Sequence, residues 1–328
     1  MILEKTGNFM TTTVGTCLVL ILFGSLLGFG ISGSVQVYKD FKLEWFFPDS
    51  SYVNEFFNWN NEFFQGGKPV TVYMRDLDYY AAQGDLDKLH LYLNNSKYVD
   101  SNEAIEDWHW EFSDSVRQTT SEWNKHIDAH GHFGEGKKDV YYEALHQWYA
   151  DGGGVRYRTR LKWLDPKCEN DTVVSIDANG DSIREWKTCD YKKGLEASRI
   201  SATLALQYTN LGQDRYDTMT NMRKELGEVM KDHGGTKTFP YSFEFLYWEE
   251  VGIIDAELIR NLIICGIVVT VMIAILIPHP RIAIWVVLSI ILSVIDLVGF
   301  MFYWDVTISG ISTIYILISV GLAVDYSA

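Results

Sequence analysis

An aspartate stands inside one of the most apolar stretches of this 328-residue chain. Residues 321–325 read Gly-Leu-Ala-Val-Asp, within an otherwise apolar run from Ile308 to Val324. A charged Asp in the centre of a membrane costs roughly 2.5–3.5 kcal/mol on insertion scales, so it survives where it faces a helix bundle or a watery path. Gly321 lies one helical turn before Asp325 and would let another helix approach the carboxylate. This spacing predicts an ion or proton site.

A second carboxylate, Asp296, interrupts another apolar stretch. It stands eight residues before Trp304, which is about 12 Å along a helix that rises 1.5 Å per residue. Asp296 and Asp325 could share a polar path without touching. The alternative for Asp296 is a helix–helix hydrogen bond that serves packing alone. We therefore predict ion coupling at Asp325 with Gly321, and we keep Asp296 as a further candidate for this role.

The four cysteines divide into two pairs. Cys17 and Cys265 lie in apolar stretches, whereas Cys168 and Cys189 lie in the polar part of the chain and close a loop of about twenty residues. In an oxidising compartment such a pair forms a disulfide, and in a reducing one it would remain two free thiols. We expect the disulfide.

Other combinations of residues give weaker evidence of a functional site. His126, His130 and His132 could offer metal ligands, but nearby glycines make the segment loop-like and no cysteine is near, so we expect neither a metal site nor a cofactor. Gly152-Gly153-Gly154 is followed by no Lys-Ser/Thr pair and no helix start, which argues against a phosphate loop. No nucleophile, base and acid can be assembled from the sequence, so we do not expect an enzyme.

Four stretches are long and apolar enough to be membrane-spanning helices. We expect them at about 12–33, 258–277, 281–304 and 306–328. The chain is still apolar at Ala328, so the last helix is expected to be cut off and the chain to be a fragment. The first stretch could instead be a cleaved signal peptide, but it is longer than a usual signal core.

The short loops predict the orientation of these spans. Lys5 precedes the first span and Arg281 lies in the turn between the second and third, so both ends are expected in the cytoplasm. We expect an integral protein of the plasma membrane or an endomembrane. Its parts are a first span with a short N-terminus (1–34), an extracellular or lumenal domain (35–256) and three further spans (257–328).

Two glycosylation acceptor sequences agree with that placement of the large domain. They are Asn94-Asn95-Ser96 and Asn170-Asp171-Thr172. The domain also holds 25 of the 28 Lys and Arg residues and 38 of the 43 Asp and Glu residues, hence most of the net charge of −15. So acidic a surface disfavours nucleic acid and anionic lipid headgroups as partners.

Helical and strand patterns alternate in the large domain. Strands are expected at 70–74, 198–208 and 238–246 from their composition and alternation. Helices are expected between them, among others at 86–93 and 214–232. This order predicts an α+β domain with a split β-α-β core, attached to an α-helical membrane bundle of four spans.

The first expected helix of the large domain is rich in aromatic residues. Ser50 or Ser51 could cap it, and aromatic side chains follow at helical spacing as far as Phe64. Such a pattern most simply indicates a helix packed into the core. The alternative is that the aromatic residues line a passage for a lipid.

Four stretches carry a resemblance to a known family. They are Phe47-Pro-Asp-Ser-Ser-Tyr with Pro69-Val-Thr-Val-Tyr, Leu195-Glu-Ala-Ser-Arg-Ile, Phe239-Pro-Tyr-Ser-Phe-Glu-Phe, and Val320-Gly-Leu-Ala-Val-Asp-Tyr-Ser-Ala. Together they resemble the patched-related branch of the resistance–nodulation–division superfamily, which includes patched, dispatched and the Niemann–Pick type C transporter. The resemblance covers nearly the whole chain.

The resemblance implies half of a permease of twelve spans, and this chain looks like the second half. It implies cation-coupled movement of a sterol or other lipid, with the family's Gly-x-x-x-Asp/Glu motif matched by Gly321 and Asp325. The partners would be a lipid or sterol cargo, a monovalent cation or proton, and the other half of the same polypeptide. The alternative is a receptor or scaffold of the same fold that binds a ligand without transport.

Overall fold

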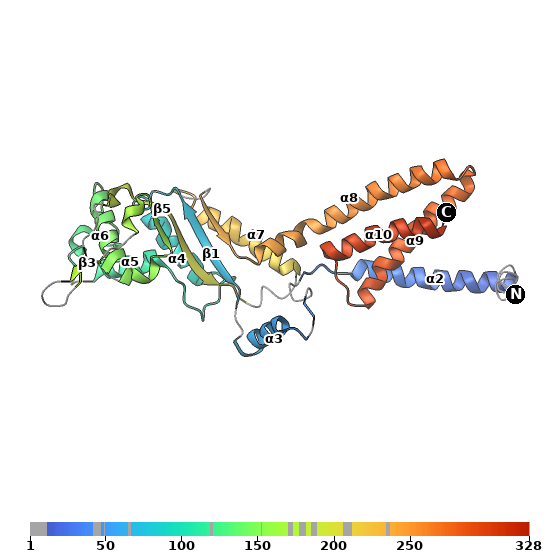
Figure 1. Cartoon of the computed structure of the whole chain (residues 1–328), viewed down its shortest axis with the longest axis horizontal. Helices are drawn as coiled ribbons and strands as arrows, with labels where there is room; N and C mark the ends of the chain where they lie inside the picture. Colours follow the sequence, from blue (N-terminus) through green and yellow to red (C-terminus); the bar gives the residue numbers. More distant parts are fainter. Residues whose placement is uncertain are drawn as a thin grey trace. The chain divides into compact units, whose positions relative to one another are not determined.

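The computed structural model describes residues 12–41, 47–48, 50–64, 67–118, 121–151, 153–169, 173–176, 182–184, 189–205, 212–233 and 237–327. They form two compact units, which Figure 1 shows together with the element labels. The first unit, called here the helical unit, comprises Met1–Asp49, Leu211–Tyr216 and Leu246–Ala328. The second, called here the sheet unit, comprises Ser50–Asn210 and Asp217–Phe245.

Apolar helices make up the helical unit. They are α2 (Thr13–Gln36), α8 (Phe245–Leu276), α9 (Pro280–Tyr303) and α10 (Gly310–Ser327). The first three are long and apolar enough to cross a membrane. At 18 residues, α10 is close to the lower limit for a span. The fourth span therefore remains a prediction.

The ends of these helices follow from local chemistry. The side chain of Thr12 accepts a hydrogen bond from the backbone N–H of Gly15 and so caps α2. Pro280 opens α9 because its missing N–H and fixed φ suit the first turn of a helix. The short turn before it brings α9 back against α8.

The helical unit is held together by apolar contacts on α9. This helix packs against α2 and against α10. One apolar cluster joins α8, α9 and α10 toward the start of α10 through Ile254, Leu258, Met301, Ile308 and Ile316. A second joins the same helices farther along α10 through Ile273, Val286, Ile290 and Val320.

The sheet unit is built on four strands in the order β2-β5-β1-β6. Their bounds are Leu161–Trp163 for β2, Leu195–Thr203 for β5, Pro69–Arg75 for β1 and Thr238–Tyr241 for β6. β1 runs antiparallel to β5, with Val72 opposite Ile200, and antiparallel to β6, with Val72 opposite Pro240. Every second residue of β1 is buried, so one face of the strand carries the core. The finer prediction of a split β-α-β core stays a prediction.

Helices of the sheet unit other than α3 bury apolar side chains. The longer helices of this unit are α3 (Tyr52–Trp59), α4 (Gln83–Asn95), α5 (Trp108–Arg117), α6 (Lys138–Asp151) and α7 (Gly212–Val229). The minor elements are a π-helical turn (Asn60–Phe64), β3 (Val173–Ile176), β4 (Ser182–Arg184), and short 3₁₀ turns at Asn124–His126, Gly153–Tyr157, Pro166–Cys168 and Tyr191–Lys193. The final strand ends at Tyr241, earlier than predicted, because a turn there leads into α8.

The aromatic helix α3 is not packed into a core, so that prediction was wrong. Ser51 caps it as expected, accepting a hydrogen bond from the N–H of Asn54. None of its residues is buried. Tyr52, Phe56 and Trp59 are exposed, as is Phe63 in the π-helical turn that follows.

Candidate functional site

The strongest sequence candidate, Asp325, lies in the last turns of α10. Its side chain is exposed. A Cβ atom built on Gly321 would meet no atom within 4 Å. The part of the chain that the structure describes therefore places no helix against this glycine, although the spacing of the two residues on one face is as predicted. The role of Asp325 remains a prediction.

Asp296 is held at a close crossing of α2 and α9. A Cβ atom on Gly30 of α2 would lie 2.9 Å from the Cα of Asp296 and 3.3 Å from its Cγ. Only a glycine leaves room for the aspartate at this point of the neighbouring helix. The Oδ1 atom of Asp296 is buried and has no hydrogen-bond partner among the described residues.

The same crossing continues one turn toward the C-terminal end of both helices. A Cβ on Gly33 would lie 2.9 Å from the Cα of Gly299, and one on Gly299 would collide with the backbone of Gly30. The two backbones are thus in direct contact. Gly30, Gly33, Asp296 and Gly299, named here the glycine–aspartate crossing, are the place where α2 and α9 pack closely beside a carboxylate.

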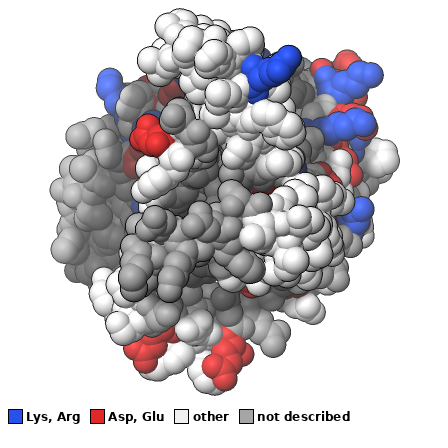
Figure 2. Space-filling model, turned by 90° about the vertical axis from the view of Figure 1, so that its right-hand side faces the viewer, with Lys and Arg blue, Asp and Glu red and all other residues white. Residues whose placement is uncertain are grey.

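An apolar cleft of about 380 Å³ opens between α8 and α9 near their connecting turn. It is lined by Thr270, Ile273, Ala274, Ile277, Pro278, Pro280, Ala283, Ile284 and Val287. Figure 2 views the molecule from the right-hand side of Figure 1, where uncharged side chains form most of the described surface. A cleft of this size and lining suits part of an apolar ligand.

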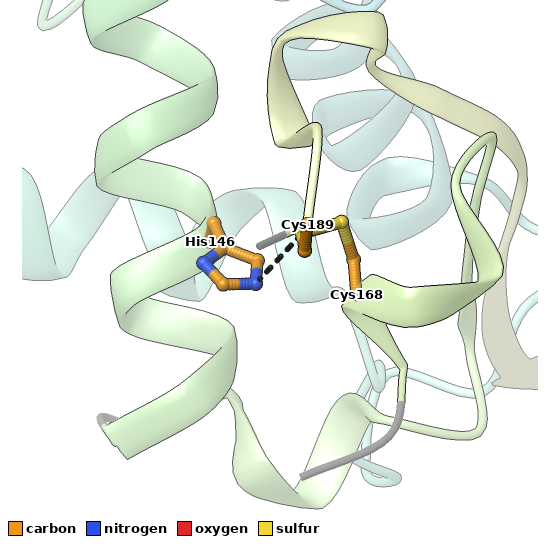
Figure 3. Close-up of side chains that lie close together, drawn as sticks. All are labelled: His146, Cys168 and Cys189. Atoms are coloured by element: carbon orange, nitrogen blue, oxygen red, sulfur yellow. Dashed lines mark hydrogen bonds between the residues drawn. A yellow bond between two sulfur atoms is a disulfide. The ribbon is translucent and has the colours of Figure 1, made fainter. Parts of the chain in front are cut away.

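In the sheet unit, the predicted pairing of Cys168 with Cys189 is present as a disulfide. Figure 3 shows His146 of α6 beside it. The Nε2 atom of His146 lies 3.6 Å from the Sγ of Cys189, and its ring stacks on Tyr191. Two thiolates and an imidazole would suit zinc, but sulfur atoms joined to each other carry no thiolate charge. In this oxidised form the three residues are a structural group.

Asp165 positions both ends of the disulfide loop. Its carboxylate accepts hydrogen bonds from the backbone N–H groups of Lys167 and Asp190, each at 3.0 Å. These bonds lower the pKa of Asp165. Sequence reasoning missed this residue, although an Asp before a proline at the start of a short helix is a recognisable capping signal.

A cluster of histidines around Asp87 also escaped prediction. His109 of α5 and His132 of a loop each direct Nε2 at the carboxylate of Asp87, at 3.1 and 2.9 Å, and Arg117 lies 3.6 Å away. Because a carboxylate only accepts hydrogen bonds, Nε2 carries the proton in both rings. The Nδ1 atom of His109 is then a buried acceptor with no partner among the described residues.

The charges in this cluster support one another. Burial alone would raise the pKa of Asp87, but the hydrogen bonds from His109 and His132 outweigh burial and lower it. The bond to Asp87 raises the pKa of His132. Of the three histidines considered as metal ligands, His132 is therefore an ion-pair partner of Asp87. No local spacing could have revealed a pair 45 residues apart.

Of the two predicted glycosylation sites, only Asn94 lies among the residues that the structure describes. Asn94 is exposed near the end of α4, as a modified asparagine must be. Asn170 lies outside the described residues.

Comparison with known proteins finds a similarity that runs along nearly the whole chain. No family model matches the chain. The chain is 24% identical to protein patched homolog 1 of Danio rerio over 374 aligned residues, which cover 99% of this chain and 30% of that protein. The chain thus spans less than a third of the length of this relative. Its long apolar helices and this similarity identify it as an integral membrane protein that resembles patched.

Proposed function

We propose that this chain is part of a patched-like permease that moves a sterol or another lipid across or within a membrane, coupled to a cation through intramembrane carboxylates. The observation that carries the proposal is Asp296, an acidic side chain that packs against Gly30 in an apolar helix pair and whose Oδ1 atom is buried without a hydrogen-bond partner among the described residues. Such a residue is costly in a membrane, and its usual roles are ion or proton relay. Asp325 with Gly321 is the second carboxylate of the proposal.

The lipid cargo is supported by two features. The resemblance to the patched-related branch implies such a cargo, and the similarity to patched homolog 1 runs along the whole chain. The cleft between α8 and α9 offers an apolar wall that suits part of such a cargo. In this proposal the chain is similar to the second half of the permease, and the other half of the polypeptide supplies the opposite wall.

Cargo export from cells tests the proposal. Asp296→Asn and Asp325→Asn each keep the size of the side chain and remove its charge. In the complete protein we expect each variant to reach the membrane and to lose most of its export, while Asp305→Asn, at a helix end, exports normally. Export by both Asn variants at the wild-type rate, still abolished by collapsing the cation gradient, would place coupling elsewhere.

A receptor or scaffold of the same fold is the second candidate. The exposed aromatic residues of α3 favour it, because aromatic side chains are common at the centres of protein interfaces. The same assay separates the two. If the wild type moves no cargo under any gradient and the Asn variants still bind ligand, the receptor function replaces the permease.

A further inference from the structure

Three side chains of the types that bind zinc meet around the disulfide of the sheet unit. One ligand atom from each of His146, Cys168 and Cys189 lies within 4.8 Å of the other two. His146 and Cys168 are buried and Cys189 is half-buried. Figure 3 shows the imidazole on α6 directed at the sulfur of Cys189, with the contact drawn as a dashed line. Two thiolates and one imidazole, with water in the fourth position, are a known ligand set of zinc.

The imidazole of His146 is oriented by three aromatic rings. It stacks on Tyr191, with ring centroids 5.3 Å apart, and on Tyr149. Trp163 meets it edge to face, also with centroids 5.3 Å apart, and is itself only 1% exposed. These contacts hold the ring without help from the sulfur atoms. Its Nε2 atom is therefore expected to keep its direction when the disulfide is reduced.

The two cysteine segments are held together by more than the S–S bond. The carboxylate of Asp165 accepts hydrogen bonds from the N–H groups of Lys167 and Asp190, each at 3.0 Å. Lys167 directly precedes Cys168, and Asp190 directly follows Cys189. One side chain thus ties the backbone beside both cysteines. Reduction is expected to leave the two thiols as neighbours, which lowers the entropic cost of gathering them around a metal.

Only a small displacement of the sulfur atoms is needed to admit zinc. A disulfide holds its sulfurs about 2.05 Å apart, whereas two sulfurs bound to tetrahedral zinc at about 2.3 Å lie about 3.8 Å apart. Rotation about the Cα–Cβ bonds can supply this difference while the backbone stays in place. A further backbone hydrogen bond, from Leu164 to the carbonyl of Gly194 at 3.0 Å, keeps the same two segments together.

The carboxylates next to the cysteines already have partners. Glu169 accepts from Lys162 at 2.6 Å and from a backbone N–H. Asp190 lies 3.7 Å from Lys193, and Asp165 is the acceptor described above. The fourth position on a metal is therefore expected to go to water, which can reach the group beside the half-buried Cys189.

We infer that Cys168, Cys189 and His146 form a zinc site when the disulfide is reduced, so that the metal closes the loop that the S–S bond closes in the oxidised form. A dithiol reductant supplies two electrons and two protons, the S–S bond breaks, and the reductant leaves as a disulfide. Zinc then displaces the proton of each thiol and binds the two thiolates and the imidazole. This site is independent of the proposed transport.

Cobalt is the probe, because it occupies zinc sites and has visible bands. The full chain in detergent, with Cys17 and Cys265 replaced by Ser, is reduced with a phosphine and freed of it without air. We expect one equivalent of cobalt to bind, with a thiolate-to-cobalt charge-transfer band and the strong d–d bands of a tetrahedral site. Added zinc should remove both. The oxidised protein should show neither.

Two histidine variants separate this site from other histidines of the sheet unit. His146→Gln should weaken cobalt binding at least tenfold, because changes even to groups that only support a ligand cost about 10–100-fold. The matched control is His130→Gln, since His130 is exposed and lies in the segment of the other candidate histidines. We expect this control to bind like the parent.

X-ray absorption at the zinc edge of the reduced parent identifies the ligands without altering them. We expect two sulfurs at about 2.3 Å and the outer-shell scattering of an imidazole nitrogen at about 2.0 Å. This measurement decides the matter even if His146→Gln does not fold.

Three results would overturn the inference. One is a reduced parent that binds no stoichiometric cobalt or zinc. Another is zinc bound to sulfur without imidazole, or to four sulfurs shared by two copies of the chain. The third is a folded His146→Gln variant with the affinity and spectrum of the parent.

Discussion

At the scale of single residues, the molecule holds its carboxylates in two contrasting ways. In the sheet unit Asp87 is surrounded by His109, His132 and Arg117. In the helical unit the part-buried Asp296 packs against Gly30 of the neighbouring helix. The first arrangement stabilises the charged carboxylate, because two imidazole N–H groups and a guanidinium lie beside it. This difference makes Asp87 structural and Asp296 a candidate for proton transfer.

The pair of His132 and Asp87 makes the sheet unit more stable in acid than in mild base. The pKa of His132 is raised above 6.5 in the fold, so its contribution is complete below the unfolded value and is lost as pH rises through the folded value. The lowered pKa of Asp87 keeps that carboxylate charged throughout this range. We expect His132→Gln to cost about 1 kcal/mol near pH 6 and less near pH 8, since a hydrogen bond to a charged group has about this worth or somewhat more.

Thermal unfolding followed by tryptophan fluorescence at several pH values measures this effect. His130→Gln is the matched control, because the exposed His130 interacts with Asp128 through its backbone N–H. Equal pH dependence in both variants would show that His132 does not carry it.

The disulfide supplies a second prediction at this scale. Cys168 and Cys189 are 21 residues apart, and a loop of that length corresponds to about 3 kcal/mol of stabilisation, mostly through the unfolded chain. Replacing both with Ser should lower stability by about this amount without changing the sheet. Denaturant unfolding of the two proteins gives the difference. Unfolding midpoints that coincide would mean that the loop ends are held by Asp165 alone.

At the scale of elements, the sequence predicted which helices and strands exist better than it predicted what surrounds each of them. The strand at β1 and the apolar helices were recognisable from alternation and from length. The surface position of α3 was not recognisable, because Tyr52, Phe56 and Trp59 have the spacing of a buried stripe and yet are exposed. Periodicity shows that one face is apolar; it does not say what covers that face.

The exposed stripe and the true core should respond differently to truncation. Leu89 of α4 is fully buried, so Leu89→Ala should cost about 2–5 kcal/mol through lost burial and a cavity. Phe56 is 60% exposed, so Phe56→Ala should change stability by less than about 0.5 kcal/mol. Chemical denaturation of the two variants tests this. A large loss in Phe56→Ala would mean that α3 is packed in the native protein.

Long-range pairing limited the prediction of the site. The glycine pattern of α2 was visible in the sequence, but its partner Asp296 is more than 260 residues away. Likewise, no residue pattern near Asp87 predicts that His132 lies beside it. The sequence could nominate Asp296 for its chemistry because a lone acid in an apolar run is unusual. Its contact with Gly30 depends on which helices pack together, and a single sequence does not reveal which ones do.

At the scale of the whole molecule, the similarity to patched homolog 1 along 99% of the chain fits a design in which apolar helices carry one large domain. We expect that domain on the extracellular or lumenal side. Asn94 should then be glycosylated in a eukaryotic cell, and glycosidase treatment should increase gel mobility. Asn94→Gln and Ser96→Ala should each remove the shift that is due to this site. An unmodified Asn94 in a correctly inserted protein would contradict the orientation.

The central proposal is that intramembrane carboxylates of this chain couple the movement of a cation to that of a lipid, and a proton is the first cation to test. The most direct test is proton flux in proteoliposomes that contain the complete protein, a pH-sensitive dye inside and a sterol cargo supplied from outside. We expect cargo-dependent proton flux in the wild type and none in the double variant Asp296→Asn and Asp325→Asn. Wild-type flux in that double variant would contradict the account.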